Sequence, residues 1–109
     1  MAVAAPRLNS SEGNVLPLTG PVVVGRAPTP PSHLRAAVLH AVTDTTSSVS
    51  RTQCVVSPIA EEIWVEDLGS SNGTDVIRAG RTTTLKAGER LQLLPGDRIE
   101  LGDAWLDVQ

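Results

Sequence analysis

Arginine and small hydroxyl residues beside apolar runs are the side chains in this sequence best suited to binding chemistry. Arg26 ends one apolar run, Ser50 and Arg51 precede a second, and Ser71 and Asn72 lie between two more. A guanidinium fork and hydroxyl donors suit the acceptor oxygens of a phosphate group. Each of these short segments is commonplace by itself, so none of them alone predicts a phosphate site.

The side chains that most enzymes and metal sites use are scarce. His33 and His40 are the only imidazoles, and Cys54 is the only thiol. The chain has no His-Glu-x-x-His metal motif, no Gly-x-Ser-x-Gly elbow and no P-loop. We therefore expect a protein that is not an enzyme and needs no metal or other cofactor, with Cys54 as a small core residue.

Composition also argues against two classes of partner. The 109 residues carry a net charge of −3, whereas a nucleic-acid-binding domain usually presents a basic surface. The sequence shows no signal peptide and no membrane span. A single cysteine cannot form an internal disulfide, which is compatible with a reducing cytoplasm. We expect a cytoplasmic monomer that binds neither nucleic acid nor membrane.

Short apolar runs separated by turn residues favour an all-β fold. The chain has no Phe or Tyr and only two Trp, so Val, Leu, Ile and Ala must fill the core. Val and Ile pack well on sheet surfaces, and regularly spaced short strands are typical of a sandwich or barrel. The expected strands cover residues 15–18, 22–24, 52–56 (ended by Pro58), 62–66, 75–77, 82–85, 90–94, 98–101 and 104–108.

The remaining segments are assigned from their composition. Residues 1–13 are small and polar and are predicted to form a flexible N-terminal arm before a single domain over residues 14–109. Residues 27–32 contain three prolines and must be a loop. Residues 43–48 are rich in Thr and Ser and are also expected to be a loop.

Residues 34–42 are ambiguous. Leu34, Val38 and Val42 have the spacing of a helix face, whereas Val38, His40 and Val42 have the spacing of a strand face. Periodicity alone leaves both structures open. We expect His40 to be an exposed strand or loop residue.

The order of three segments resembles the forkhead-associated (FHA) domain family. Gly25-Arg26 closes a strand, Ser50-Arg51-Thr52-Gln53 opens another, and residues 67–74 read Asp-Leu-Gly-Ser-Ser-Asn-Gly-Thr. The family pattern is a strand ending in Gly-Arg, then Ser-Arg-x-His, then Asp-x-Gly-Ser-x-Asn-Gly-Thr. A late Pro-Gly-Asp before a strand ending in Leu-Gly, here residues 95–102, also recurs in the family. The resemblance covers almost the whole chain.

The resemblance implies a two-sheet β-sandwich of about eleven mostly antiparallel strands, with the ligand loops at one end. It implies a phosphothreonine peptide as the ligand, with Asn72 bonding the peptide main chain beside the phosphothreonine. The expected partner is a Thr-phosphorylated protein in Ser/Thr kinase signalling, either a kinase substrate or the kinase itself. The phosphopeptide-binding residues are expected to be Arg26, Ser50, Arg51, Ser71 and Asn72.

Six further motif residues are expected to support the loops. The glycines allow tight turns or positive φ, and the aspartate and threonine hold the loop by local hydrogen bonds. Gln53 departs from the family, which usually has a His there to brace the binding loops; Gln also donates and accepts hydrogen bonds, but its extra torsion predicts a looser brace. The six residues are Gly25, Gln53, Asp67, Gly69, Gly73 and Thr74.

Gln53 and the long proline-rich interval between Arg26 and Ser50 leave a second function open. This alternative is a phospho-independent assembly module that uses a sheet face or an edge strand. A partner that stays bound after phosphatase treatment and after Arg26→Ala would indicate it.

Overall fold

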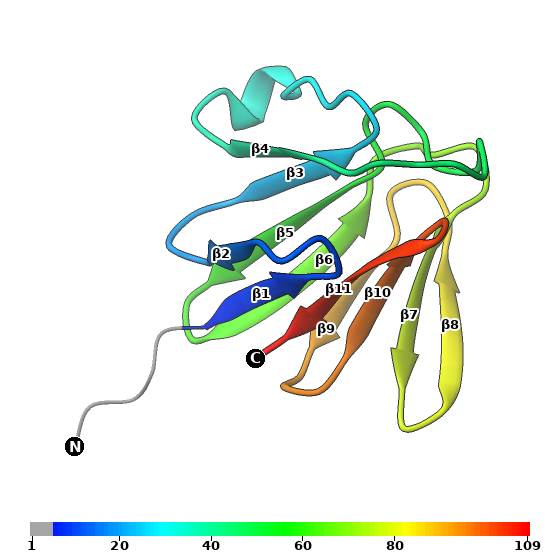
Figure 1. The fold of residues 1–109 in the computed structure, drawn as a ribbon. Helices are drawn as coiled ribbons and strands as arrows, with labels where there is room; N and C mark the ends of the chain where they lie inside the picture. Colours follow the sequence, from blue (N-terminus) through cyan, green and yellow to red (C-terminus); the bar gives the residue numbers. More distant parts are fainter. Residues whose placement is uncertain (1–5) are drawn as a thin grey trace.

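Short strands build the whole fold in the computed structural model, which describes residues 6–109 (Figure 1). One sheet has six strands: β1 (Arg7–Ser10), β2 (Val15–Pro17), β7 (Thr74–Arg78), β8 (Arg81–Leu85), β10 (Arg98–Leu101) and β11 (Ala104–Val108). The other has five: β3 (Val22–Gly25), β4 (Val38–Ala41), β5 (Cys54–Ile59), β6 (Glu62–Asp67) and β9 (Arg90–Leu93).

The order of the strands agrees with the predicted sandwich. It is β2-β1-β11-β10-β7-β8 in one sheet and β4-β3-β5-β6-β9 in the other. Among the described residues, every pairing is antiparallel except that of β3 with β4. The predicted all-β fold of about eleven mostly antiparallel strands is confirmed.

Aliphatic side chains from both sheets fill the space between them. Val24 and Val65 come from the five-stranded sheet, Ile99 and Leu106 come from the six-stranded sheet, and all four have no exposed surface. Burying each such side chain contributes about 1.5–3 kcal/mol relative to leaving it in water. Cys54 belongs to the same core, as predicted, and burial raises the pKa of its thiol to about 12.

His40 is buried in β4, so the prediction that it is exposed is wrong. It pairs in parallel register with Val24, an inward-facing residue of β3, and it is 9% exposed. Its Nε2 has no hydrogen-bond partner among residues 6–109. Burial lowers the pKa of the imidazole, and the nearby Glu12 carboxylate opposes that shift only in part. The neutral imidazole therefore acts as a core residue at the edge of the sandwich.

The segment that periodicity left open, residues 34–42, contains the strand β4, so the helical spacing of Leu34, Val38 and Val42 does not correspond to a helix face. A single 3-10 turn, η1 (Ser32–Leu34), precedes β4. No helix among residues 6–109 is long and apolar enough to cross a membrane.

The outer face of the five-stranded sheet is covered as well. Val23 and Val55 alternate with inward-facing residues, yet they are only 0% and 5% exposed.

Strand β1 lies inside the segment that was predicted to be a flexible arm. Leu8 has no exposed surface and pairs with Val108 of β11. The arm prediction over residues 1–13 is therefore wrong for residues 7–10, because one buried leucine and the free edge of β11 add this short polar segment to the sheet. Residues 1–5 of that prediction lie outside the described residues.

Pro58 lies inside β5, so the prediction that it ends this strand is wrong. It pairs with Ile63 of β6. On its other side, β5 pairs with β3 only as far as Val56. The missing N–H of a proline is tolerated at such a position, because one side of the strand has no neighbour there.

The late Pro-Gly-Asp motif has a structural role. Asp97 is 1% exposed, and its carboxylate accepts two hydrogen bonds from Arg78 at 2.9 and 2.6 Å. Arg78 also donates to the Gln92 carbonyl of β9 at 2.8 Å. These hydrogen bonds from Arg78 are the main cause of the lowered pKa of Asp97. Arg78 of β7 thus ties the six-stranded sheet to β9 of the five-stranded sheet.

Candidate functional site

Three loops meet at one end of the sandwich, after β3, between β4 and β5, and between β6 and β7 (Figure 1). They line a cavity of about 340 Å³. Four of the five residues that the resemblance assigns to the ligand lie around it. The lining residues are Arg26, Asp44, Ser47, Ser48, Val49, Ser50, Ser71 and Asn72.

Arg26 follows β3 directly, and its neighbours fix its position. Its backbone N–H donates to the Ser50 carbonyl at 3.1 Å, and its Nε donates to the Val49 carbonyl at 3.3 Å. Within residues 6–109, no carboxylate lies within ion-pair distance of Arg26, and its terminal nitrogens make no hydrogen bond. The two terminal nitrogens are therefore available to an anion in the cavity.

Ser50 and Ser71 bring two hydroxyl groups to the same cavity from different loops. The Ser71 backbone N–H donates to Ser50 Oγ at 2.9 Å. Because Ser50 Oγ accepts this bond, its own proton remains available for donation to a ligand. The hydrogen bond also holds the two loops at a fixed separation.

Asn72 and Arg51 differ in how the structure places them. Asn72 lines the cavity, and its Nδ2 donates to the Ser48 carbonyl at 3.1 Å. Arg51 is exposed and does not line the cavity, although its carbonyl accepts a hydrogen bond from the Ala27 N–H at 3.1 Å. A role for the Arg51 side chain in binding therefore stays a prediction.

Gln53 joins two of the loops through one buried amide. It is 3% exposed, and its Oε1 accepts a hydrogen bond from the Ser50 N–H at 2.9 Å. Its Nε2 donates to the Gly73 carbonyl at 2.7 Å and to Thr74 Oγ1 at 3.1 Å. The predicted loop-supporting position of Gln53 thus corresponds to three hydrogen bonds that span the β4–β5 and β6–β7 loops.

Asp67 and Thr74 continue this network below the β6–β7 loop. Asp67 is 1% exposed, and its carboxylate accepts hydrogen bonds from the N–H groups of Gly69 and Ser70 and from the Ser70 hydroxyl. The Thr74 hydroxyl donates to Asp67 Oδ1 at 2.6 Å and accepts from Gln53. A buried carboxylate with this many donors is well satisfied, so the network fixes the loop's shape.

Two glycines of the motif are required by contact with neighbouring backbone. A Cβ on Gly25 would lie 1.9 Å from the Arg51 carbonyl oxygen. Gly25 does not have a positive φ, so close approach, and not the turn conformation predicted from sequence, explains it. Gly73 has a φ of +81° and a Cβ there would lie 2.8 Å from the Leu85 carbonyl oxygen, so both reasons apply.

Replacing Gln53 with alanine should destabilise the fold by about 2–4 kcal/mol, because the Ser50 N–H and the Gly73 carbonyl lose their buried partner. Urea unfolding followed by circular dichroism measures the change. Gln53→His is the informative companion, since a neutral imidazole keeps one acceptor and one donor. We expect it to recover at least half of the lost free energy. Equal stability of the wild type and Gln53→Ala would contradict the bracing role.

Asp44 is a site residue that the sequence analysis missed. Its Oδ1 accepts from the Thr46 N–H at 2.9 Å and from the Thr46 hydroxyl at 2.6 Å, while its Oδ2 accepts from the Val49 N–H at 2.9 Å. The Thr46 hydroxyl first, and then the Val49 N–H, lower the pKa of Asp44. The sequence does contain a signal for this role, because Asp44 begins a Thr/Ser tract. An Asp at such a position typically organises its own loop by hydrogen bonds.

The turn between β10 and β11 packs against the β4–β5 loop that carries Asp44. Thr45 Oγ1 donates to Asp103 Oδ2 at 2.5 Å. A Cβ on Gly102 would lie 2.7 Å from Asp44 Oδ1, so the turn packs directly against the loop that carries Ser48 and Val49. This contact joins segments that are far apart in the chain.

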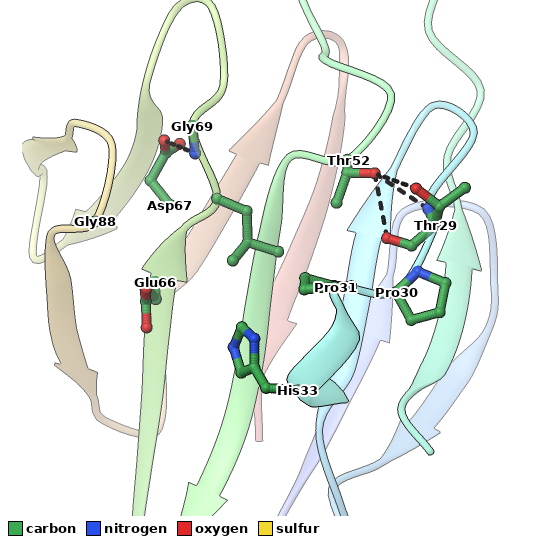
Figure 2. Close-up of a pocket in the computed structure, with 10 residues that line it drawn as sticks. Thr29, Pro30, Pro31, His33, Thr52, Glu66, Asp67, Gly69 and Gly88 are labelled. Atoms are coloured by element: carbon green, nitrogen blue, oxygen red, sulfur yellow. Dashed lines mark hydrogen bonds between the residues drawn. The ribbon is translucent and has the colours of Figure 1, made fainter. Parts of the chain in front are cut away.

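A second cavity, of about 440 Å³, is lined by other residues and is less suited to an anion. Figure 2 shows its proline-rich wall, with Thr29 bonded to Thr52 and with His33 across from Glu66. Neither arginine nor lysine lines it. Among residues 6–109, no group of three His, Cys, Asp or Glu side chains forms a metal site. Of these two cavities, the smaller one around Arg26 is therefore the better suited to an anion such as phosphate.

Solved structures with the same fold come from several sources. The human APLF FHA domain in complex with an XRCC1 bisphospho peptide is 18% identical, with a TM-score of 0.68, 96% of this chain and 97% of that chain covered. The MEK1 FHA domain in complex with a HOP1 phosphothreonine peptide is 27% identical, with a TM-score of 0.65 and coverages of 98% and 97%. The FhaA FHA domain, complexed with the intracellular domain of another protein, is 24% identical, with a TM-score of 0.67 and coverages of 96% and 100%.

The sequence itself matches a family model. No curated protein matches the chain significantly. The FHA domain model, however, matches residues 22–102, which is well over half of the chain and includes all three loops of the cavity. The chain therefore belongs to the FHA domain family.

Proposed function

We propose that this chain is a phosphothreonine-peptide recognition module and that the phosphate binds in the cavity around Arg26. The observation that carries the proposal is the Arg26 guanidinium, whose terminal nitrogens have no partner within residues 6–109 and which shares its cavity with the hydroxyls of Ser50 and Ser71. A phosphate at neutral pH carries about −1.5 to −2 charge and three acceptor oxygens. A guanidinium and two hydroxyls complement that group.

The FHA domains of APLF and MEK1 support the same class of ligand, because their structures were solved with phosphorylated peptides. By this proposal the partner is a Thr-phosphorylated protein, either a Ser/Thr kinase substrate or the kinase itself, in the cytoplasm. The module contributes binding and no catalytic step. Arg51 would add a second cation from the rim, and Asn72 would bond the peptide main chain next to the phosphothreonine.

Selection of phosphothreonine over phosphoserine depends on one methyl group. Burying a methyl is worth roughly 0.8 kcal/mol, or about fourfold in Kd. A larger preference requires the methyl to fix the rotamer of the bound residue or to fill a shaped pocket.

Isothermal titration with a phosphothreonine peptide library tests the proposal. Each peptide is compared with its phosphoserine and unphosphorylated counterparts. We expect binding of some phosphothreonine peptides, weaker binding of phosphoserine and no binding after phosphatase treatment. Absence of binding to every phosphopeptide, or equal binding of unphosphorylated peptides, would overturn it, and the second result would indicate phospho-independent assembly.

A further inference from the structure

The cavity around Arg26 holds charges of both signs. Arg26 lines one part of it, and Asp44 lines another. The two side chains make no ion pair with each other, since the ion pairs within residues 6–109 are Arg78–Asp97 and Arg98–Asp107. A cavity that binds a dianion therefore also contains a carboxylate that Arg26 does not neutralise.

Asp44 is ionised at neutral pH and keeps some capacity to bind. The loop supplies three donors to its carboxylate, two from Thr46 and one from Val49. A carboxylate has about four acceptor positions, so one position, on Oδ2, is not used by these bonds. The loop uses both carboxylate oxygens as acceptors, so an Asp is suited to organising it. The negative charge of Asp44 is nevertheless present in the cavity, and no cation within residues 6–109 forms an ion pair with it.

The charge has a consequence for any phosphorylated ligand. A cavity of about 340 Å³ is small enough to hold the phosphate and Asp44 within roughly the Debye length of physiological salt, which is about 8 Å. The two negative groups then repel each other with little screening. A ligand that also brings a positive side chain removes this repulsion and gains an attraction to Asp44.

We infer that the peptide recognised by this domain carries a lysine or arginine close to its phosphothreonine, and that Asp44 selects that residue. The inference rests on the proposed function and adds to it the charge pattern of the partner. Arg26 and the hydroxyls of Ser50 and Ser71 bind the phosphate, whereas Asp44 binds the neighbouring positively charged side chain of the peptide. A purely acidic phosphopeptide is the ligand that this cavity disfavours.

The test is a positional peptide scan. Phosphothreonine peptides of otherwise neutral sequence carry a single Arg or a single Glu at each of the three positions on either side, and fluorescence polarisation gives each Kd. One exposed charge pair changes affinity by about two- to fivefold. We expect at least one position at which Arg binds about tenfold more tightly than Glu, because attraction replaces repulsion. The ratio should shrink in 0.5 M salt.

Two variants distinguish a direct effect of Asp44 on the peptide from the effect of net charge and from disruption of the loop. Asp44→Asn should reduce the Arg-to-Glu ratio to near one. Asp103→Asn makes the same change in net charge at a residue whose carboxylate accepts a hydrogen bond from Thr45 of the same loop, but Asp103 does not line the cavity. We expect this matched control to keep the ratio of the wild type.

Each other outcome has a definite meaning. The inference is overturned if the wild type shows no charge preference, if the preference survives Asp44→Asn, or if Asp103→Asn abolishes it equally. In all three cases phosphothreonine binding itself still stands. If Asp44→Asn lowers the affinity for every peptide equally and keeps the Arg-to-Glu ratio of the wild type, Asp44 only organises the loop, and the inference is again overturned. If no phosphopeptide binds, the proposed function and the inference fall together.

Discussion

Arg26→Ala is expected to remove most phosphopeptide binding, at a cost of about 2–5 kcal/mol, or roughly 30- to several-thousand-fold in Kd. The guanidinium is the one cation that lines the cavity within residues 6–109, and its terminal nitrogens are not committed to any other group there. Without it, the phosphate loses its paired donors and still faces Asp44. Titration calorimetry with a peptide that binds the wild type measures the loss.

Two controls define the effect of Arg26. Arg81→Ala removes the same charge from an exposed position in β8, away from the cavity, and should change Kd by less than about twofold. Arg26→Lys keeps the charge but not the planar fork, so it should recover only part of the affinity. Thermal unfolding checks that the fold persists. Binding by Arg26→Ala within threefold of the wild type would contradict a phosphate site at this cavity.

The short-range part of the site could be predicted from sequence. Asp67 is followed by Gly69 and Ser70, whose N–H groups it accepts, and Thr74 lies only seven residues away. Such bonds are formed within one loop, so motif order and residue type are sufficient to indicate them. Nine of the eleven strands were also predictable, because short apolar runs between turn residues mark them.

The parts that sequence did not reveal depend on contacts between distant segments. Asp44 is held in place partly by the turn at Gly102, and the loop that it organises has no apolar periodicity. His40 is buried because β4 pairs in parallel with β3, a long-range choice that a short ambiguous segment does not encode. β1 is a strand because β11, at the other end of the chain, offers it an edge.

Gly25→Ala is expected to be the most destabilising small substitution near the site. The added Cβ would lie 1.9 Å from the Arg51 carbonyl oxygen and 2.7 Å from its carbonyl carbon, and both are backbone atoms. Relief of that overlap requires a shift of the backbone around Arg51. The shift strains the bond from the Gln53 N–H to the Val24 carbonyl, which is 2.8 Å long. We expect a loss of about 3 kcal/mol or more, and a fall in Tm of roughly 12 °C or more.

Gly20→Ala is the matched control for Gly25→Ala. Gly20 does not have a positive φ, and an added Cβ there meets no atom within 4 Å, so its effect should stay within about 1 kcal/mol of zero. Differential scanning calorimetry of both variants separates steric overlap from the general effect of losing a glycine. If Gly25→Ala still folds, it should bind phosphopeptide more weakly than the wild type, because Ser50 adjoins the displaced segment. Equal Tm values for the two variants would show that β3 and the β4–β5 loop do not approach as closely as this site requires.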